Sequence, residues 1–366
     1  MYSNDNRTVI TLDAGGTNFA FGAIKGNKFI VEPLVLPSNA DDLDRCLETM
    51  VEGFTRIIDK LDEKPVAISF AFPGPADYPN GIIGGYLPNF PSFRDGVALG
   101  PFLEDKFGIP VYINNDADLY AYGEALGGVL PELNEKLAKS GSNKHFNNLL
   151  AFTFGTGFGF GFVSKGELHI GDNSCVETFC LRHKHMPRVM VEEGVSIRAV
   201  KRVYAEESGS TDITLTPKDI FEIAEGRRAG DVEAAKTAFA MLGEVAGDAM
   251  ATAVTLIDGV IVIGGGLSAA AKYIKPALLK EMRSKIHTMQ GGSLNRVQMA
   301  VYDLDNEAEF EAFAKGESRT IKVYGSEREV SYDPQKRIGI TFSKIGANAA
   351  TSVGAYAFAL NQLDKK

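Results

Sequence analysis

The sequence predicts a mixed α/β protein with two domains. Its 366 residues are enough for two sizeable hydrophobic cores. The first 115 residues read as strands and helices in the order β-β-β-α-β-α-β, which is typical of one mixed α/β domain. The stretch NLLAFTFGTGFGFGFV at 148–163 then repeats the plan of the chain's opening: a strand, a glycine turn with threonine, and a strand. This repetition favours a second α/β domain.

Hydrophobic periodicity and turn residues define the elements of the first domain. Apolar runs at 9–12 and 19–24 flank a Gly-Gly turn, which predicts a β-hairpin. Cys46 falls on the apolar face of a helix and is expected in the core. In chain order the sequence predicts a hairpin over 9–24, a third strand at 29–36, a helix over 41–61, a buried strand at 66–72 and, after a short helix, a strand at 111–114.

The second half contains further elements and two stretches that look inserted. The expected elements are two strands within 148–163, helices over 217–225 and 231–256, a buried strand entering a glycine turn over 259–268, and a terminal helix over 346–360. The stretches at 130–148 and 303–337 are polar or rich in charge. We interpret them as solvated surface; an oligomer contact or a lid is the alternative.

Composition excludes several classes of protein. A net charge of −9 argues against non-specific binding to nucleic acid, which needs a basic face. Three cysteines, Cys46, Cys175 and Cys180, make no disulfide framework and suit a reducing compartment. The polar N-terminus and the short apolar runs predict neither a signal peptide nor a membrane span. We therefore expect a cytoplasmic protein that binds no membrane.

The opening motif DAGGTN is suited to phosphate binding. Gly15 and Gly16 allow positive φ and let a ligand approach the backbone. Backbone N–H groups and the Thr17 hydroxyl at such a turn can hold phosphate oxygens, and Asp13 can face Mg²⁺ directly or through water. A plain Gly-Gly hairpin is the alternative for this stretch alone. It is not a Walker A loop, because no Gly-Lys-Ser/Thr follows.

Three glycine turns in this order resemble those of the actin-like ATPase superfamily of sugar kinases. DAGGTN is similar to the first phosphate motif of that superfamily, GTGFG at 155–159 to the second, and IGGGLS at 263–268 to the adenosine motif. Within the superfamily the chain resembles the ROK family (repressors, uncharacterised reading frames and kinases). The further motifs that carry this resemblance are AFPGPAD at 71–77, INNDADLYAYGEALGG at 113–128 and SKIGANAATSVGA at 343–355.

The resemblance implies a fold and an ATP site. The fold would be two actin-like (ribonuclease H-like) domains with an interdomain cleft: residues 1–115, rejoined by the C-terminal helix 346–366, and the larger 116–345. The implied ATP-binding residues are Asp13, which would also face Mg²⁺, Gly15, Gly16, Thr17 and Asn18 on one side, Gly155, Thr156 and Gly157 opposite them, and Gly264, Gly265 and Gly266 at the adenosine.

The resemblance also implies a catalytic base and a sugar site. The general base of the family matches Asp116, which would take the proton of the attacking hydroxyl, and the neighbouring Asn115 would hold sugar hydroxyls. Asp118 is interpreted as a residue of the helix start rather than a second base. Taken alone, this Asn-Asn-Asp stretch would be a helix N-cap. The other implied sugar-binding residues are Gly74, Asn89, Glu177 and Glu192.

The chain departs from the family at its zinc motif. Cys180 stands where relatives have a histidine, and the segment that matches their cysteine run reads HKHMPRVM at 183–190, without cysteine. We therefore do not expect the structural zinc of the family. Cys175, Cys180, His183 and His185 could form a substitute Cys₂His₂ site, but a metal-free loop is favoured. Without the histidine, the sugar preference of typical glucokinases cannot be transferred to this chain.

These motifs lead to one function and three alternatives. The main hypothesis is an ATP-dependent, glucokinase-like hexose kinase that uses magnesium, phosphorylates the 6-hydroxyl, and forms a homodimer, as the resemblance suggests. A kinase for mannose, fructose or an N-acetylated hexosamine is one alternative. A non-catalytic sugar-sensing regulator is another, disfavoured because the first motif leaves no room for a preceding DNA-binding domain. The third is an actin-like ATPase that acts on something other than a sugar.

Overall fold

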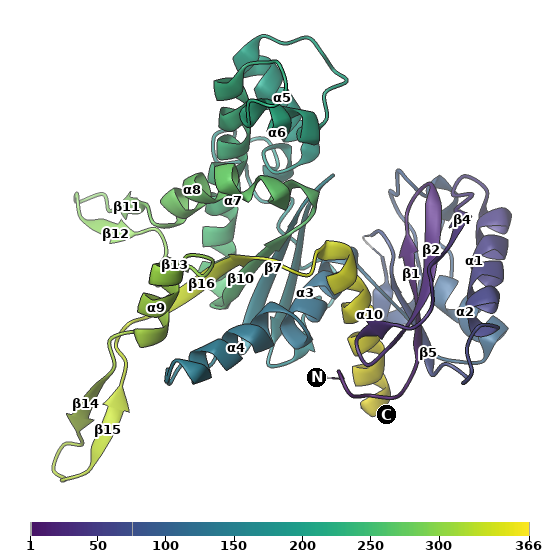
Figure 1. Cartoon of the computed structure of the whole chain (residues 1–366), viewed down its shortest axis with the longest axis horizontal. Helices are drawn as coiled ribbons and strands as arrows, with labels where there is room; N and C mark the ends of the chain where they lie inside the picture. Colours follow the sequence, from purple (N-terminus) through teal and green to yellow (C-terminus); the bar gives the residue numbers. More distant parts are fainter. Residues whose placement is uncertain (1, 75, 366) are drawn as a thin grey trace. The chain divides into compact units, whose positions relative to one another are not determined.

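The computed structural model describes residues 2–74 and 76–365, and the chain forms two compact units (Figure 1). The first unit comprises Met1–Pro131, Gly161–Val176 and Ile345–Lys366, and the second comprises Glu132–Phe160 and Glu177–Lys344. These units are not the segments expected as domains, because 116–131 and 161–176 group with the first unit. Pro75 of the AFPGPAD motif lies outside the described residues. The predicted α/β class is confirmed in both units.

The first unit is a mixed sheet with helices on both faces. The hairpin is confirmed: β1 and β2 pair antiparallel, while β1, β5 and β6 run parallel, in the order β3-β2-β1-β5-β6, with β4 on β2. The elements of this unit are β1 (Val9–Ala14), β2 (Asn18–Lys25), β3 (Lys28–Phe29), β4 (Leu34–Pro37), α1 (Leu43–Ile58), β5 (Ala67–Ala71), α2 (Leu99–Phe107), β6 (Val111–Asn114), α3 (Asp116–Leu126), β9 (Glu167–Leu168) and α10 (Ala347–Asp364).

Alternation along β1 explains why two different helices cover the sheet. Ile10 and Leu12 belong to a core that includes Phe54 and the buried Cys46 of α1. Val9, on the opposite face, packs with Tyr356 of α10. Successive strand residues point to opposite faces, so one strand contributes to both cores. The larger core is rich in aromatic contacts, such as Phe21 to Phe54 with ring centroids 5.1 Å apart.

A second sheet has the strand order β13-β16-β10-β7-β8-β9, of which β13, β16, β10 and β7 belong to the second unit. β10 runs parallel to both β7 and β16. Its strands and the accompanying elements are α4 (Val129–Lys139), β7 (Asn148–Phe154), β8 (Phe158–Ser164), α5 (Ile197–Ser208), α6 (Pro217–Ala224), α7 (Val232–Ile257), β10 (Val260–Gly264), α8 (Ala271–Met282), β11 (Lys285–His287), β12 (Ser293–Asn295), β13 (Ala300–Asp303), α9 (Glu307–Lys315), β14 (Arg319–Lys322), β15 (Glu329–Tyr332) and β16 (Arg337–Phe342).

Helix α7 is the one described helix that is long and apolar enough to cross a membrane by length and composition. More than half of its most apolar window is buried, and it packs against α5, α6 and α8. Core helices of soluble proteins satisfy the same criteria, so this helix is weak support for a membrane span.

Two predicted segments differ in detail from the structure. The strand expected at 29–36 is divided into β3 and β4, which both pair with β2. The polar stretch at 130–148 contains most of helix α4, and 303–337 contains α9 and the exposed β14–β15 hairpin. Both stretches therefore contain regular secondary structure.

Candidate functional site

Three sequence motifs meet at the carboxyl ends of neighbouring strands in the first unit. In the register of the sheet, Asp13 of β1 lies beside Ala71 of β5, and Ala71 lies beside Asn114 of β6. The three strands are parallel, so Asp13 at the end of β1 and the residues that follow β5 and β6, Gly74 and Asp116 among them, lie at the same edge of the sheet. With neighbouring strands about 4.8 Å apart, Asp13 and Asn114 are roughly 10 Å apart.

The first glycine turn, Gly15–Thr17, is fixed by a residue that the sequence did not indicate. The buried Ser38 donates its hydroxyl to the Gly16 carbonyl at 2.6 Å, and its N–H to the Thr17 carbonyl at 3.0 Å. A Cβ on Gly16 would lie 2.9 Å from the Asn89 Cβ. Close approach to Asn89 therefore explains this glycine, because neither Gly15 nor Gly16 has positive φ.

The residues around this turn are open to ligands. Asp13, which follows the apolar run of β1, has an exposed side chain, as do Thr17 and Asn18 at the tip. Asn89 is also exposed, and it places a side chain of the predicted sugar site against the first glycine turn. A carboxylate, a hydroxyl and two amides therefore share one accessible surface of the first unit.

Asn115 and Asp116 begin helix α3. Asn115 is its N-cap and accepts the Ala117 N–H at 2.8 Å, and the Asp116 carboxylate accepts the same N–H at 2.9 Å. The Asp116 side chain is accessible to water but has protein around it. This desolvation raises the pKa of Asp116, backbone N–H groups partly offset the rise, and the negative charge of Asp13 adds to it. The two interpretations of this stretch are compatible, because Asn115 is the N-cap and Asp116 remains the candidate base.

Asp118 differs from Asp116 in its surroundings. It lies in the first helical turn, as predicted, but its side chain is only 6% exposed. Burial and the neighbouring Asp116 charge raise the pKa of Asp118 to about 8. Asp118 is therefore mostly protonated at neutral pH, and a neutral acid is no proton acceptor.

The second and third glycine turns, Gly155–Gly157 and Gly264–Gly266, adjoin each other in the second unit. Gly264 of β10 pairs with Thr153 of β7, so both turns follow the ends of neighbouring parallel strands. Gly265 has φ +88°, and a Cβ there would lie 2.3 Å from the Phe154 carbonyl oxygen, so only glycine fits. Gly155 and Gly266 have open space where a Cβ would be.

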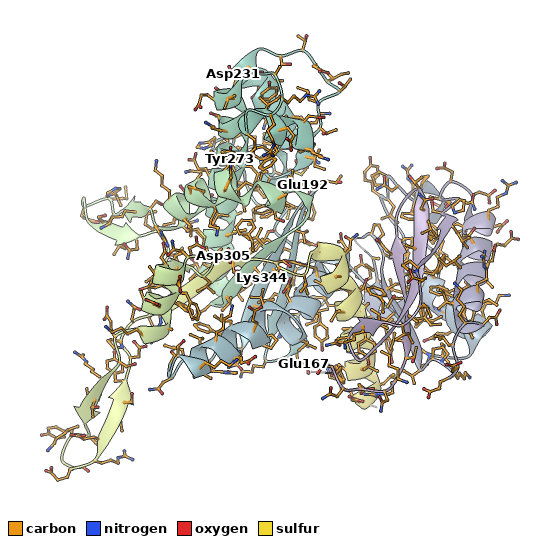
Figure 2. The ribbon with its side chains drawn as sticks, in the orientation of Figure 1. Glu167, Glu192, Asp231, Tyr273, Asp305 and Lys344 are labelled. Carbon is orange, nitrogen blue, oxygen red and sulfur yellow. The ribbon has the colours of Figure 1, made fainter. Side chains whose placement is uncertain are left out.

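Glu192 is built into the second glycine turn. One carboxylate oxygen accepts the Phe158 N–H at 3.0 Å, and the other pairs with Arg198 at 2.7 Å (Figure 2 shows Glu192). Arg198 also donates to the Thr156 carbonyl at 3.3 Å and to Glu193 at 2.9 Å. The glutamate predicted to bind sugar thus also supports the second glycine turn, a role that sequence reasoning missed.

The remaining predicted sugar residues lie in two places. Gly74 is half-buried in the first unit, where a Cβ would collide with the Tyr78 hydroxyl, 2.2 Å away. Glu177 is half-buried in the second unit, and Cys180 nearby in sequence is exposed. Among the described residues, no group of three or more His, Cys, Asp or Glu side chains is arranged to hold a metal ion.

The structure therefore brings the predicted site residues together in two groups. The first unit holds Asp13, Gly15, Gly16, Thr17, Asn18, Gly74, Asn89, Asn115 and Asp116, and the second unit holds Gly155, Thr156, Gly157, Glu177, Glu192, Gly264, Gly265 and Gly266.

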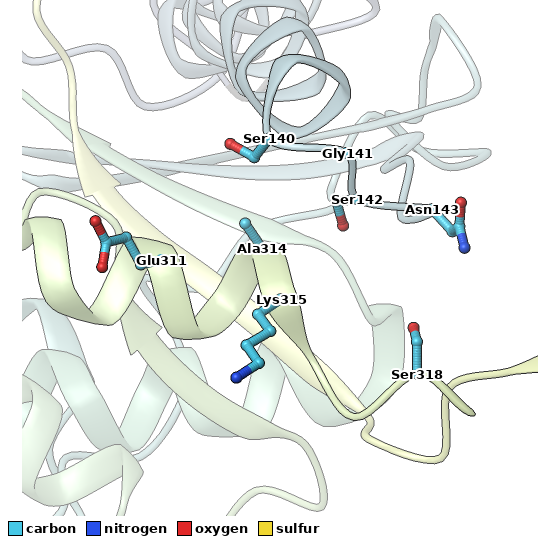
Figure 3. A pocket seen from close by; sticks show the side chains of 8 residues that line it. All are labelled: Ser140, Gly141, Ser142, Asn143, Glu311, Ala314, Lys315 and Ser318. Atoms are coloured by element: carbon cyan, nitrogen blue, oxygen red, sulfur yellow. The ribbon is translucent and has the colours of Figure 1, made fainter.

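Two other hollows of the second unit involve none of these residues. One, of about 390 Å³, lies between the end of α4 and α9 (Figure 3), and it is lined mainly by small polar side chains such as Ser140, Ser142 and Ser318. The other, of about 510 Å³, is lined largely by apolar residues that include Met282 and Tyr302. Neither hollow is lined by any of the predicted ATP-binding or sugar-binding residues.

Comparison with known proteins identifies the family. The ROK family model matches residues 9–308. The crystal structure of a glucokinase from Parabacteroides distasonis is 63% identical, with 99% of each chain covered and a TM-score of 0.91. This chain belongs to the ROK family, and the family resemblance expected from its motifs is confirmed.

Curated relatives include both enzymes and regulators. A glucokinase of Thermotoga maritima is 29% identical over 168 residues, which are 44% of this chain and 46% of the relative. The DNA-binding transcriptional repressor Mlc of Escherichia coli is 25% identical over 276 residues, 71% of this chain and 63% of the repressor. The matched segments thus span about half to two thirds of these two relatives.

Proposed function

We propose that this protein is an ATP-dependent hexose kinase of the glucokinase type, which transfers the γ-phosphate to the 6-hydroxyl of a hexose. The observation that carries the proposal is the alignment of Asp13, Ala71 and Asn114 at one edge of the first sheet. This alignment supports the proposal because the first glycine turn, the AFPG motif and Asn115-Asp116 all lie at that edge. The 63% identity to the Parabacteroides glucokinase supports the same activity.

The chain's own residues supply positioning and a proton acceptor. Asp116 would accept the proton of the attacking hydroxyl, and its raised pKa makes it a stronger base than an ordinary aspartate. Asn115, Asn89, Gly74, Glu177 and Glu192 would orient the sugar. The first and second glycine turns would hold the phosphates through backbone N–H groups, and Gly264–Gly266 would lie against the adenosine.

Magnesium fits the first unit, because Asp13 is an exposed carboxylate beside a turn that can hold phosphate oxygens. A bound Mg²⁺ would neutralise phosphate charge, and Asp13 would hold it directly or through water.

We propose further that the protein acts in the cytoplasm, in glycolysis, as a homodimer, and that it carries no structural zinc. The similarity to the repressor Mlc keeps a sugar-sensing regulator as the second candidate.

A coupled assay with magnesium-ATP tests the proposal on glucose, mannose, fructose, N-acetylglucosamine and N-acetylmannosamine. We expect turnover of at least one hexose. Asp116→Asn should lower kcat by about two to four orders of magnitude and leave ATP affinity within a factor of three, because it removes the proton acceptor alone. Sugar binding in calorimetry without turnover of any sugar would favour the regulator, and near-normal kcat in the variant would exclude Asp116 as the base.

A further inference from the structure

The loop of residues 177–193, here named the sugar loop, carries both proposed sugar glutamates and folds back on itself. Arg182 and Met190 form an isolated antiparallel bridge. The His183 N–H donates to the Val189 carbonyl at 2.8 Å, and the Val191 N–H donates to the Leu181 carbonyl at 2.7 Å. Residues 184–188 therefore form the tip. An interaction that fixes this tip therefore also fixes the path of the chain from the tip to Glu192.

A single lysine at the tip connects the sugar loop to two helices. The Lys184 ammonium lies 2.5 Å from a Glu244 carboxylate oxygen in α7 and 2.6 Å from a Glu281 carboxylate oxygen in α8. The Lys184 side chain is only 25% exposed and that of Glu281 only 12%. Charge-assisted bonds in such a partly buried setting are stronger than surface ion pairs. The pairing with Lys184 holds the pKa of Glu244 below its usual value.

The side chains near this tip do not fit the structural zinc that the family resemblance implies. The His183 Nδ1 accepts the His185 N–H at 3.2 Å, and a Cβ on Gly194 would lie 2.5 Å from the His183 Nε2. His183 is thus engaged on one side and closely packed on the other. Cys180 is exposed, and Met190 replaces a thiolate. The described part of the sugar loop offers no set of three donors for a metal ion.

We propose that the ion pairs of Lys184 with Glu244 and Glu281 hold the sugar loop in place, in the region where the family resemblance implies a zinc ion. Lys184 is then a positioning residue for the sugar site rather than a catalytic residue. The inference rests on the proposed sugar-kinase function for its kinetic consequence. Its structural consequence, a loop fixed by lysine and not by metal, is independent of that function.

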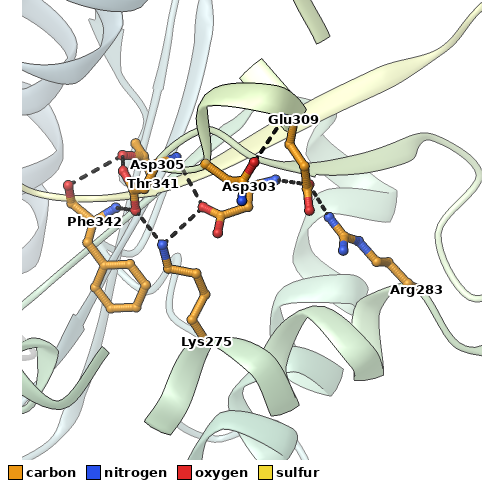
Figure 4. Close-up of polar contacts among 8 residues, drawn as sticks. Lys275, Arg283, Asp303, Asp305, Glu309, Thr341 and Phe342 are labelled. Carbon is orange, nitrogen blue, oxygen red and sulfur yellow. Dashed lines mark hydrogen bonds and ion pairs between the residues drawn. The ribbon is translucent and has the colours of Figure 1, made fainter. Parts of the chain in front are cut away.

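The chain contains a matched control for this ion-pair cluster. Lys275 of α8 also lies between two carboxylates, 3.0 Å from Asp303 and 2.8 Å from Asp305 (Figure 4), and its side chain is 19% exposed. Lys275 connects α8 to the end of β13 and to the segment that follows it. Lys184→Met and Lys275→Met therefore remove the same kind of interaction from the same unit, and only the first concerns the sugar loop.

The kinetic experiment compares both variants on the hexose that the wild type phosphorylates best. We expect Lys184→Met to raise the sugar KM about tenfold, the loss typical of a charge-assisted bond, with the ATP KM changed less than threefold. Lys184→Arg, which keeps the charge, should stay within about threefold of the wild type. Lys275→Met should leave both KM values within twofold. Equal sugar KM values for Lys184→Met and the wild type would overturn the inference.

Two readouts do not depend on activity. In hydrogen–deuterium exchange, amides of residues 177–193 should exchange faster than in the wild type in Lys184→Met, and at the wild-type rate in Lys275→Met. Metal analysis of the purified full chain should find less than about 0.1 zinc per chain, and a chelator should leave Tm unchanged. Stoichiometric zinc with a chelator-sensitive Tm, or unchanged exchange in the loop, would contradict the inference even if the chain is an active kinase. Absence of turnover on every hexose would contradict the proposed function alone.

Discussion

At the residue scale, burial separates two aspartates of one helical turn. Asp116 is accessible and is the candidate base, whereas Asp118 is buried in the same turn. The pKa of Asp118 is raised to about 8, far above the usual value near 3.9. Between these two pKa values the folded chain keeps a proton that the unfolded chain releases. The free energy of unfolding therefore falls as the pH rises from about 4 to about 8, and it levels off above pH 8.

Asp118→Asn should remove this pH dependence. The amide is always neutral, so the variant should gain stability over the wild type as the pH rises from 5 to 8, by at most roughly 4 kcal/mol over these three pH units. Thermal unfolding followed by circular dichroism at pH 5, 6, 7 and 8 measures the gain. Asp95→Asn, at an exposed position, is the control and should show no such trend. A Tm difference that is constant with pH would contradict the prediction.

The two aspartates also show what the sequence can and cannot predict about the site. The motif around Asn115-Asp116 identified the candidate base, but nothing in Asp-Ala-Asp distinguishes an accessible carboxyl from a buried one. Ser38 was missed for a similar reason, because its contacts to Gly16 and Thr17 connect positions about twenty residues apart. Side-chain contacts across the fold leave no periodic signal in the chain.

At the scale of elements, the second glycine turn depends on the start of helix α5. The Ile197 N–H donates to the Gly155 carbonyl at 2.8 Å, and Arg198 contacts the Thr156 carbonyl and Glu192. Each of the three guanidinium nitrogens of Arg198 has a protein partner, and two of them contact carboxylates. Arg198 is therefore neutralised, and it is suited to shaping the turn rather than to binding phosphate itself.

Arg198→Ala should weaken ATP binding because the turn loses its support. We expect the KM for ATP, and the Kd of a non-hydrolysable ATP analogue, to rise about five- to tenfold. Arg227→Ala is a matched control, because Arg227 also pairs with two glutamates, Glu222 and Glu225, outside the site. Calorimetry with the analogue and steady-state kinetics measure both variants. An unchanged Kd in Arg198→Ala would show that the turn is rigid without this side chain.

Element prediction succeeded where local patterns are strong. The hairpin of β1 and β2 and the helices α6 and α7 lie within a few residues of the predicted ranges. Helix α4 was missed because its polar composition concealed a short apolar pattern, Val129, Leu130, Leu133 and Leu137, all of which are buried. The division of 29–36 into β3 and β4 depends on pairing with β2, which the segment itself does not encode.

At the scale of the whole molecule, strand order determines the candidate site. β1, β5 and β6 are neighbours although helices separate them in sequence, so their motifs converge. The sequence alone does not give this order; the family resemblance implied only the actin-like fold, and the ROK match over residues 9–308 supports that resemblance. The net charge of −9 is compatible with the proposed binding of an anionic nucleotide, because the N–H groups of glycine turns and a bound Mg²⁺ would provide local positive potential.

The β14–β15 hairpin lies in the charged insertion at 303–337, and its deletion tests whether this insertion contributes to stability, activity or oligomeric state. All eight of its strand residues are exposed, and an isolated two-stranded hairpin contributes little stability. At its base, Asp333 pairs with the buried Arg337, and this pair anchors the segment to β16. Replacing residues 319–332 by Asn-Gly should keep that anchor, because Arg319 and Tyr332 are cross-strand partners and a two-residue turn can join their neighbours.

We expect this deletion to leave Tm within about 2 °C and kcat/KM within twofold, as for a solvated surface segment that buries no core residue. Thermal unfolding and the coupled hexose assay measure these two quantities, and sedimentation velocity measures the oligomeric state. A change from dimer to monomer would show that the hairpin is a contact between copies. A fall in kcat/KM at unchanged sedimentation would instead indicate that it closes over the substrate. Either result would contradict the interpretation of this insertion as solvated surface.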